Sequence, residues 1–260
     1  MREKDLFIGI YSPERRLIEF QVEMKNIKGA LSKVSNIITK LGINICSGFI
    51  TAYPEKPDAL FSFIADITNV NITTEQVVEK LKKLDIVLKV SFYEPKIKGF
   101  MIDNLHFPIL VLGERSLTFR IESIGRMFKR LYEIFGSGAS FIIYQMGLAL
   151  GGEKVEKLRS KYNMSDEEIL SIILNERIAK GWGIPELIDF SKIESRAIIR
   201  VYELFECLPF KGKEKEAKSY FFKGYLEGVL AKIFGKEVKI SEEKCIAKGD
   251  DYCEFTYCSL

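Results

Sequence analysis

Alternating apolar and polar residues mark the first regular element of the chain. Residues 18–24 place Ile, Phe, Val and Met on one face and Glu or Gln on the other, which is the period-two pattern of a strand. A turn ending in Gly29 leads to residues 30–41, whose apolar positions recur at helical spacing. We therefore expect a strand and then an amphipathic helix that stops at Gly42, because glycine readily adopts the left-handed conformation.

The pattern continues as far as residue 93. Two predicted strands, at residues 43–51 and 59–67, are joined by a loop that contains two prolines. A capping box from Thr73 to Gln76 precedes a second helix, and residues 86–93 alternate as a final strand. The resulting order, βαββαβ, is that of the ferredoxin-like sandwich, which hosts many unrelated functions.

The rest of the chain mixes long helical patterns with short strand patterns, which predicts an α/β domain. Little periodicity is present between the halves, so we expect a first domain at residues 1–97, a linker at 98–104 and a second domain at 105–260. The whole chain is thus assigned to the α/β (α+β) class. The elements expected in the second domain are helices at 121–136, 137–162, 167–183 and 219–235, and strands at 184–190, 197–205, 236–240 and 252–257.

The helix expected at residues 137–162 is apolar on nearly all sides between Ala139 and Leu150. Gly147 and Gly151 lie about one turn apart on it. We expect this helix to be buried, with another element passing close to the two glycines.

Composition and charge narrow the function classes. The chain is 47% hydrophobic and 29% charged, with 39 basic and 36 acidic residues, the balance of a soluble globular protein. A net charge of +3 without a helix-turn-helix or zinc-finger pattern argues against direct nucleic-acid binding. Because we find neither a leader with a cleavage site nor an apolar stretch of membrane-spanning length, we expect a cytoplasmic protein with no membrane partner. Abundant Ile, Lys and Glu fit a thermophile.

Histidine and cysteine restrict the possible chemistry further. His106 is the only histidine, so a Ser/His/Asp triad or a Cys/His pair would have to be built on it. In a reducing compartment the five cysteines are better interpreted as core residues or metal ligands than as disulfides. Cys46, within a predicted strand, is expected to pack in the core.

The segment EFQVEMKNIKGALSKVSNIITKLGINI resembles ACT domains, and the resemblance extends over about residues 15–95. In that family a residue such as Asn26 and a glycine such as Gly29 open the first helix, and the usual ligand is an amino acid, often bound between paired copies. The resemblance implies an amino-acid site at these residues, because Gly29 permits close backbone approach and free N–H groups hold a carboxylate. A tight turn in a plain dimerisation module explains Gly29 equally well. Both interpretations imply a homodimer.

The segment FFKGYLEGVLAKIFGKEVKISEEKCIAKGDDYCEF resembles the 4-vinyl reductase domain, and this resemblance extends over about residues 105–260. The family includes the sensor domains of phenol-responsive transcription activators and is similar in fold to subunits of the vesicle-tethering transport particle. Its members share a hydrophobic cavity for a small or acyl ligand. The residues that match its signature are Gly224, Gly228, Glu242, Cys245, Gly249, Cys253 and Phe255.

Cys245 and Cys253 bracket a loop that contains Gly249, which allows both sulfurs to face one point. In the phenol-sensing relatives a glutamate and two cysteines at these places hold zinc, together with a third cysteine on the preceding helix. The resemblance therefore implies a structural zinc ion at Glu242, Cys245 and Cys253. Without a metal, the two cysteines would be small buried side chains.

The fourth ligand stays open, because the helix position is Ser219, a poor zinc ligand. Cys207, Cys258 or a water molecule is an alternative to it. Glu243 is an alternative to Glu242.

The resemblance also implies an apolar cavity in the second domain for a small aromatic or otherwise hydrophobic ligand. His106 and Trp182 are the polar-tipped residues most similar to those that orient phenols in the relatives. Aromatic residues at helical spacing are equally typical of a plain core. The expected lining is Phe141, Tyr144, Trp182, Phe221, Phe222 and Tyr225.

Three functions compete. Two ligand-binding types of module and few catalytic residue types favour a small-molecule sensor or regulatory protein. The family name suggests a reductase-related enzyme of vinyl-group or tetrapyrrole metabolism, but we find no recognisable nicotinamide or flavin motif. The likeness to transport-particle subunits suggests a ligand-free assembly protein.

Overall fold

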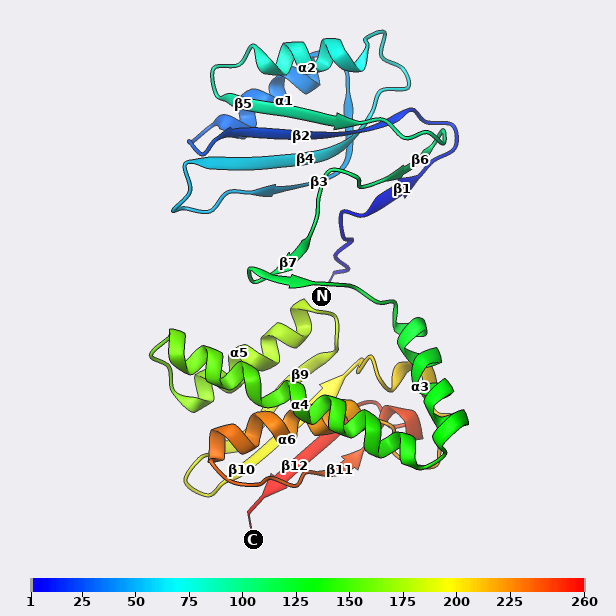
Figure 1. Ribbon diagram of the computed structural model, residues 1–260, viewed down its shortest axis with the longest axis vertical. Coiled ribbons are helices and arrows are strands. Elements are labelled where there is room, and N and C mark those ends of the chain that lie inside the picture. Colours follow the sequence, from blue (N-terminus) through cyan, green and yellow to red (C-terminus); the bar gives the residue numbers. More distant parts are fainter. Residues whose placement is uncertain (1, 260) are drawn as a thin grey trace. The chain divides into compact units, whose positions relative to one another are not determined.

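The computed structural model describes residues 2–259 and divides the chain into two compact units (Figure 1). The first unit ends at Leu117 and the second begins at Thr118. The chain has the mixed α/β class that the sequence predicts, with antiparallel sheets in both units.

The first unit contains the predicted βαββαβ sandwich. Its four main strands form an antiparallel sheet in the order β3-β4-β2-β5, and helices α1 and α2 lie on one side of this sheet (Figure 1). This is the ferredoxin-like order, with the first and third strands of the motif in the centre. The elements are β2 (Leu17–Lys25), α1 (Ala30–Lys40), β3 (Asn44–Thr51), β4 (Asp58–Asp66), α2 (Thr74–Lys82) and β5 (Val87–Tyr93).

Alternation within the strands builds the core of this unit. The apolar positions of β2 and β4 face the helices, where Phe20, Val34 and Val77 are fully buried. The capping box at α2 is confirmed, because the Gln76 backbone N–H donates to Thr73 and the Thr73 N–H donates to the Gln76 side chain. Burial of the two helices against one sheet face therefore stabilises the sandwich.

Two predictions in the first unit are wrong. Residues 98–104 are not a free linker, since β6 (Phe100–Ile102) pairs with β1 (Gly9–Tyr11), and Met101 is buried against the sheet face opposite the helices. Strands of three residues are too short to show periodicity. Cys46 is exposed rather than in the core, because the register of the edge strand β3 shifts between Ile45 and Ser47.

A short hairpin ends the first unit. Strand β7 (Ile109–Val111) pairs with β8 (Glu114–Ser116), and the boundary between the units follows it at Leu117. His106 therefore belongs to the first unit, whereas the sequence pattern placed it at the start of the second domain.

The second unit packs its helices on an antiparallel sheet with strand order β11-β12-β10-β9. Its largest apolar cluster joins α5 and α6 to β10 and β12 through residues such as Ile173, Leu226 and Phe255. The elements are α3 (Ile121–Phe135), α4 (Gly138–Lys161), α5 (Asp166–Ala179), β9 (Ile184–Ser191), β10 (Arg196–Tyr202), η1 (Leu208–Phe210), α6 (Tyr220–Phe234), β11 (Ser241–Lys244), η2 (Ile246–Lys248) and β12 (Cys253–Cys258).

The strand expected at residues 236–240 is wrong, since the strand in this region, β11, begins at Ser241. Val238 and Ile240 are buried, as their alternation suggested. The Ile240 backbone N–H, however, donates to the Glu227 carboxylate at 2.9 Å instead of to a neighbouring strand. A side chain has replaced the strand partner, which the alternation of apolar residues cannot reveal.

Helices α4 and α6 cross through glycines contributed by both. A Cβ atom on Gly147 would overlap the carbonyl oxygen of Phe221, and one on Gly224 would overlap that of Tyr144. The predicted close approach at the α4 glycines is thus confirmed. Burial of the whole helix is not, because Phe141 and Leu150 are exposed.

Among the described residues, no helix is long and apolar enough to cross a membrane.

Candidate metal centre and aromatic cluster

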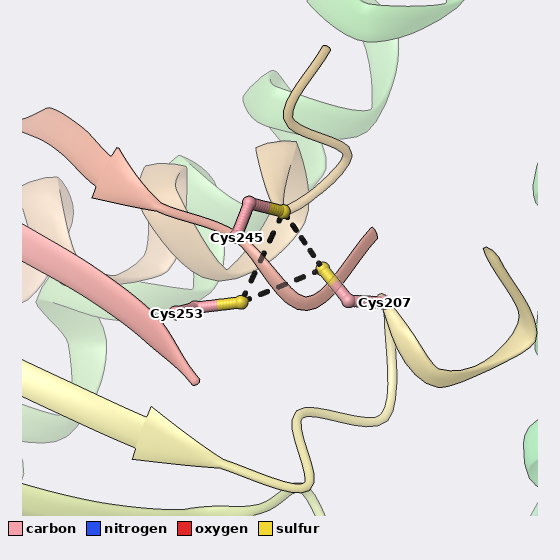
Figure 2. Close-up of side chains that lie close together, drawn as sticks. All are labelled: Cys207, Cys245 and Cys253. Carbon is pink, nitrogen blue, oxygen red and sulfur yellow. Dashed lines mark hydrogen bonds between the residues drawn. The ribbon is translucent and has the colours of Figure 1, made fainter. Parts of the chain in front are cut away.

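Three thiols from separate segments of the second unit face one point (Figure 2). Cys207 precedes η1, Cys245 follows β11 and Cys253 begins β12, and all three side chains are buried. Their sulfur atoms lie 3.6 Å (Cys207 to Cys245), 3.7 Å (Cys207 to Cys253) and 4.0 Å (Cys245 to Cys253) apart. Tetrahedral zinc with Zn–S bonds of about 2.3 Å requires sulfur separations of roughly 3.8 Å. The three thiols therefore fit a zinc ion.

Ser219 and Glu242 lie beside the thiols. The Ser219 hydroxyl, at the start of α6, contacts Cys245 Sγ at 3.6 Å and donates a hydrogen bond to the Glu242 carboxylate. The structure thus brings the expected Glu242, Cys245 and Cys253 to one place, with Cys207 as the third thiol. Cys258 is exposed at the end of β12, and Glu243 is bonded by the Ser241 hydroxyl.

The charges of these groups are strongly coupled. Hydrogen bonds from Cys207 and Cys253 lower the pKa of Cys245, whereas hydrogen bonding to Cys245 and burial raise the pKa of Cys207. Burial, followed by the charge of Cys245, raises the pKa of Glu242 to about 9. Without a cation, the pocket thus favours one thiolate held by neighbouring protons. Because a zinc ligand must be deprotonated, a bound ion would displace those protons.

An aromatic cluster occupies the same unit, between α5, α6 and the residues after β10. Trp182 lies 5.5 Å from Phe205, 5.5 Å from Phe221 and 5.3 Å from Tyr225, measured between ring centroids. The Arg177 guanidinium lies over Trp182 at 4.4 Å and over Tyr225 at 4.9 Å. The cluster therefore combines packed aromatic rings with a buried cation.

Two polar atoms in this cluster are buried without a hydrogen-bond partner, Tyr225 Oη and Arg177 Nε. Burial raises the pKa of Tyr225 to about 12, so the phenol stays protonated and is a potential hydrogen-bond donor. Buried polar atoms are normally paired, because each unpaired one costs on the order of 1–3 kcal/mol. This site is the kind of place where a ligand oxygen would be held.

The six expected cavity residues do not share one cavity. Trp182, Phe221 and Tyr225 lie together, and Phe222 packs next to them against Phe255. Phe141 is 66% exposed. Phe141 and Tyr144 line a separate open groove of about 320 Å³ with Ser140, Tyr220, Lys223, Glu227 and Lys239.

Sequence reasoning missed two charged residues of this unit. Arg177 is 4% exposed inside the apolar surface of α5, and Glu227 is 2% exposed within α6. Tyr144 donates to the Glu227 carboxylate at the edge of the groove. A charged residue at a position where the helical pattern requires an apolar one is the signal that would have found both.

The amino-acid residues expected in the first unit are placed differently from a free site. The Asn26 side-chain amide donates to the carbonyl oxygens of Tyr53 and Lys56, at 2.8 and 2.9 Å, and so holds the loop between β3 and β4. Gly29 has a φ of 82°, which favours glycine, and no side chain caps the helix that follows it.

A family model matches part of the second unit. Residues 198–257 match the 4-vinyl reductase (V-4-R) domain, a shorter stretch than the resemblance at residues 105–260. Cys207, Cys245, Cys253 and Glu242 all lie within the matched residues.

An uncharacterized protein of Methanocaldococcus jannaschii is 27% identical over 122 residues, which cover 46% of this chain and 65% of the relative. The chain thus spans less than two thirds of that relative's length.

Two solved structures are similar to separate parts of the chain. The phenol-responsive sensory domain of the transcription activator PoxR, solved with phenol, is 17% identical with a TM-score of 0.49, over 56% of this chain and 78% of that one. The ACT domain of the GTP pyrophosphokinase of Chlorobium tepidum is also 17% identical, with a TM-score of 0.26, over 30% of this chain and 99% of that one.

Proposed function

We propose that this chain is a small-molecule-responsive regulatory protein whose second unit binds an aromatic or otherwise apolar ligand. The observation that carries the proposal is the pair of unpartnered polar atoms, Tyr225 Oη and Arg177 Nε, buried among aromatic rings. Ligand sites are mostly apolar with a few polar groups that fix orientation, and this cluster has that composition. The family match at residues 198–257 includes Tyr225 and Phe221.

The ligand would enter by displacing rings, because the aromatic side chains pack against one another. A flat molecule that inserts beside Trp182 would exchange one ring contact for another at little cost in buried area. A hydroxyl or carbonyl group on that molecule would accept from Tyr225 or Arg177 and pair the buried donors. The preferred ligand is therefore a small aromatic molecule with one polar oxygen, such as a phenol.

We further propose a structural zinc ion held by Cys207, Cys245 and Cys253. The fourth ligand is Glu242, freed from Ser219, or a water molecule. A bound zinc would link the segment after β10 to both ends of the loop between β11 and β12. That loop and the start of α6 are next to the aromatic cluster, so the metal would fix the scaffold on which the ligand site is built.

For the first unit we propose an ACT-type role with an amino acid as the second ligand and a homodimer as the functional form. The uncapped start of α1 at Gly29 supports the ligand, and the edges of the four-stranded sheet support pairing of two copies. Light scattering at micromolar concentration tests the dimer, and a monomer would remove the interfacial site.

A thermal-shift screen of phenols, indoles, fatty acids and amino acids tests the ligand proposal. We expect a small phenol or related aromatic to raise the melting temperature of the wild-type protein. Tyr225→Phe keeps the ring and removes one hydrogen bond, so ligand affinity should fall about fivefold, the equivalent of about 1 kcal/mol. The matched control is Tyr257→Phe, at another buried tyrosine of the unit.

The result that contradicts the proposal is equal ligand stabilisation in wild type and Tyr225→Phe, or no stabilisation by any compound. The second outcome favours an assembly protein without a ligand. A flavin or nicotinamide that co-purifies with the protein would favour a reductase-related enzyme instead.

A further inference from the structure

A second group of potential metal ligands lies in the first unit, on the sheet face opposite the helices. Glu19 is on the central strand β2, and Asp103 and His106 are in the segment that follows β6. His106 Nδ1 lies 2.8 Å from Asp103 Oδ1 and 3.3 Å from Glu19 Oε1. The β1–β6 pair covers this face around Leu17 and Met101, so the three ligand atoms meet where the covering segment is attached to the sheet.

The Glu19 carboxylate is fully buried, and its environment does not pair it completely. Glu19 Oε2 accepts from the Asn104 backbone N–H at 3.0 Å, but Oε1 has no hydrogen-bond partner and points toward His106. Asp103 is a second carboxylate within 4.8 Å of it. Two carboxylates with one imidazole leave negative charge in a nearly closed space, and this charge is costly unless a cation compensates it.

The histidine ring is held in a fixed orientation. Ser62, fully buried on β4, lies with its hydroxyl 2.7 Å from His106 Nε2. The Ser62, His106 and Asp103 side chains follow one another as in a hydrolase triad, but burial of the Ser62 hydroxyl keeps it from a substrate. Its role is that of an outer partner, because a hydroxyl that accepts from Nε2–H leaves the Nδ1 lone pair free to face a metal.

From this geometry we infer that Glu19, Asp103 and His106 form a divalent-cation site that fastens the segment after β6 to the sheet. Ligand atoms at metal bonds of about 2.1 Å occupy neighbouring octahedral positions roughly 3.0 Å apart, close to the two distances at His106 Nδ1. Carboxylate and imidazole donors suit Mn²⁺ and similar ions and differ from the thiols of the second unit, which select zinc. The two sites therefore bind different ions.

Manganese is the probe of choice because it favours oxygen and nitrogen donors over thiolates. Titration of the full-length protein with Mn²⁺, followed by the electron paramagnetic resonance of the free ion, should show about one site per chain. Glu19→Gln and His106→Gln should each weaken binding at least tenfold. Glu23→Gln is the matched control, since Glu23 lies on the same face of β2 and pairs with Lys89 at 3.4 Å, and it should bind as wild type.

A second readout uses wild-type protein alone and does not depend on variants that fold. His106 is the only histidine, so its imidazole signals in a nuclear magnetic resonance spectrum are unambiguous. Substoichiometric Mn²⁺ should broaden them before other signals. The proposal is overturned by an absence of Mn²⁺ binding up to millimolar concentration, by binding that leaves the His106 signals sharp, or by equal affinity in Glu19→Gln and wild type. Each result would mean that these side chains form only a hydrogen-bonded attachment.

Discussion

At the scale of single residues, the three thiols make the most specific prediction. Purified protein should contain about one zinc ion per chain, and Cys245→Ser or Cys253→Ser should release it. Because metal binding is coupled to folding, each variant should also destabilise the second unit by at least about 2 kcal/mol. Elemental analysis together with chemical denaturation measures both effects.

Cys258→Ser is the control for this experiment. Cys258 belongs to the same strand as Cys253 but is exposed, so its removal should change neither zinc content nor stability. Retention of zinc after substitution of Cys245, or metal-free protein with wild-type stability, would show that the thiols are core residues.

The candidate site could be predicted only in part, and the reason lies in sequence separation. Cys245 and Cys253 are close in the sequence around Gly249, so a local loop brings them together. Cys207 is 38 residues before Cys245 and joins them only through the folded sheet, so the sequence left it as one of several alternatives. Arg177 was missed because it looks like an ordinary helical residue until its burial is known.

At the scale of elements, the α4–α6 crossing depends on the absence of side chains at its centre. Gly224→Ala would place a methyl group against the Tyr144 carbonyl oxygen, a backbone atom that cannot move without separating the helices. We expect a loss of stability of roughly 2 kcal/mol or more, measured by urea denaturation.

Gly152→Ala on α4 is the matched test. A Cβ atom there would meet Lys232 Cγ at 3.1 Å, and this flexible side chain can move away. Alanine also favours a helix over glycine by about 1 kcal/mol, so this variant should be neutral or stabilising. Equal effects of the two substitutions would mean that the crossing does not require close backbone contact.

Elements with long, regular patterns were predictable and short ones were not. The βαββαβ order followed from alternation in strands of seven to nine residues and from capping at Thr73. The three-residue strands β1 and β6 carry no periodic signal, and their pairing joins positions about ninety residues apart. That single long-range pairing also moved the domain boundary, because it draws residues 100–102 into the first unit.

At the scale of the whole molecule, the two units carry different kinds of candidate site. The first unit brings carboxylates and a histidine under a covering strand pair, and the second brings thiols and aromatic rings together around α6. This division is consistent with a regulatory protein that responds to more than one small ligand. Its central claim is that the aromatic cluster of the second unit takes up one of them.

Fluorescence of Trp182 tests that claim most directly, because Trp182 is the only tryptophan and lies inside the cluster. The wild-type protein should be titrated with the compound that gives the largest thermal shift. The account predicts a saturable change in Trp182 emission at one molecule per chain, with affinity about fivefold lower in Tyr225→Phe. A compound that stabilises the protein while Trp182 emission stays constant, or equal affinity in the two proteins, would contradict it.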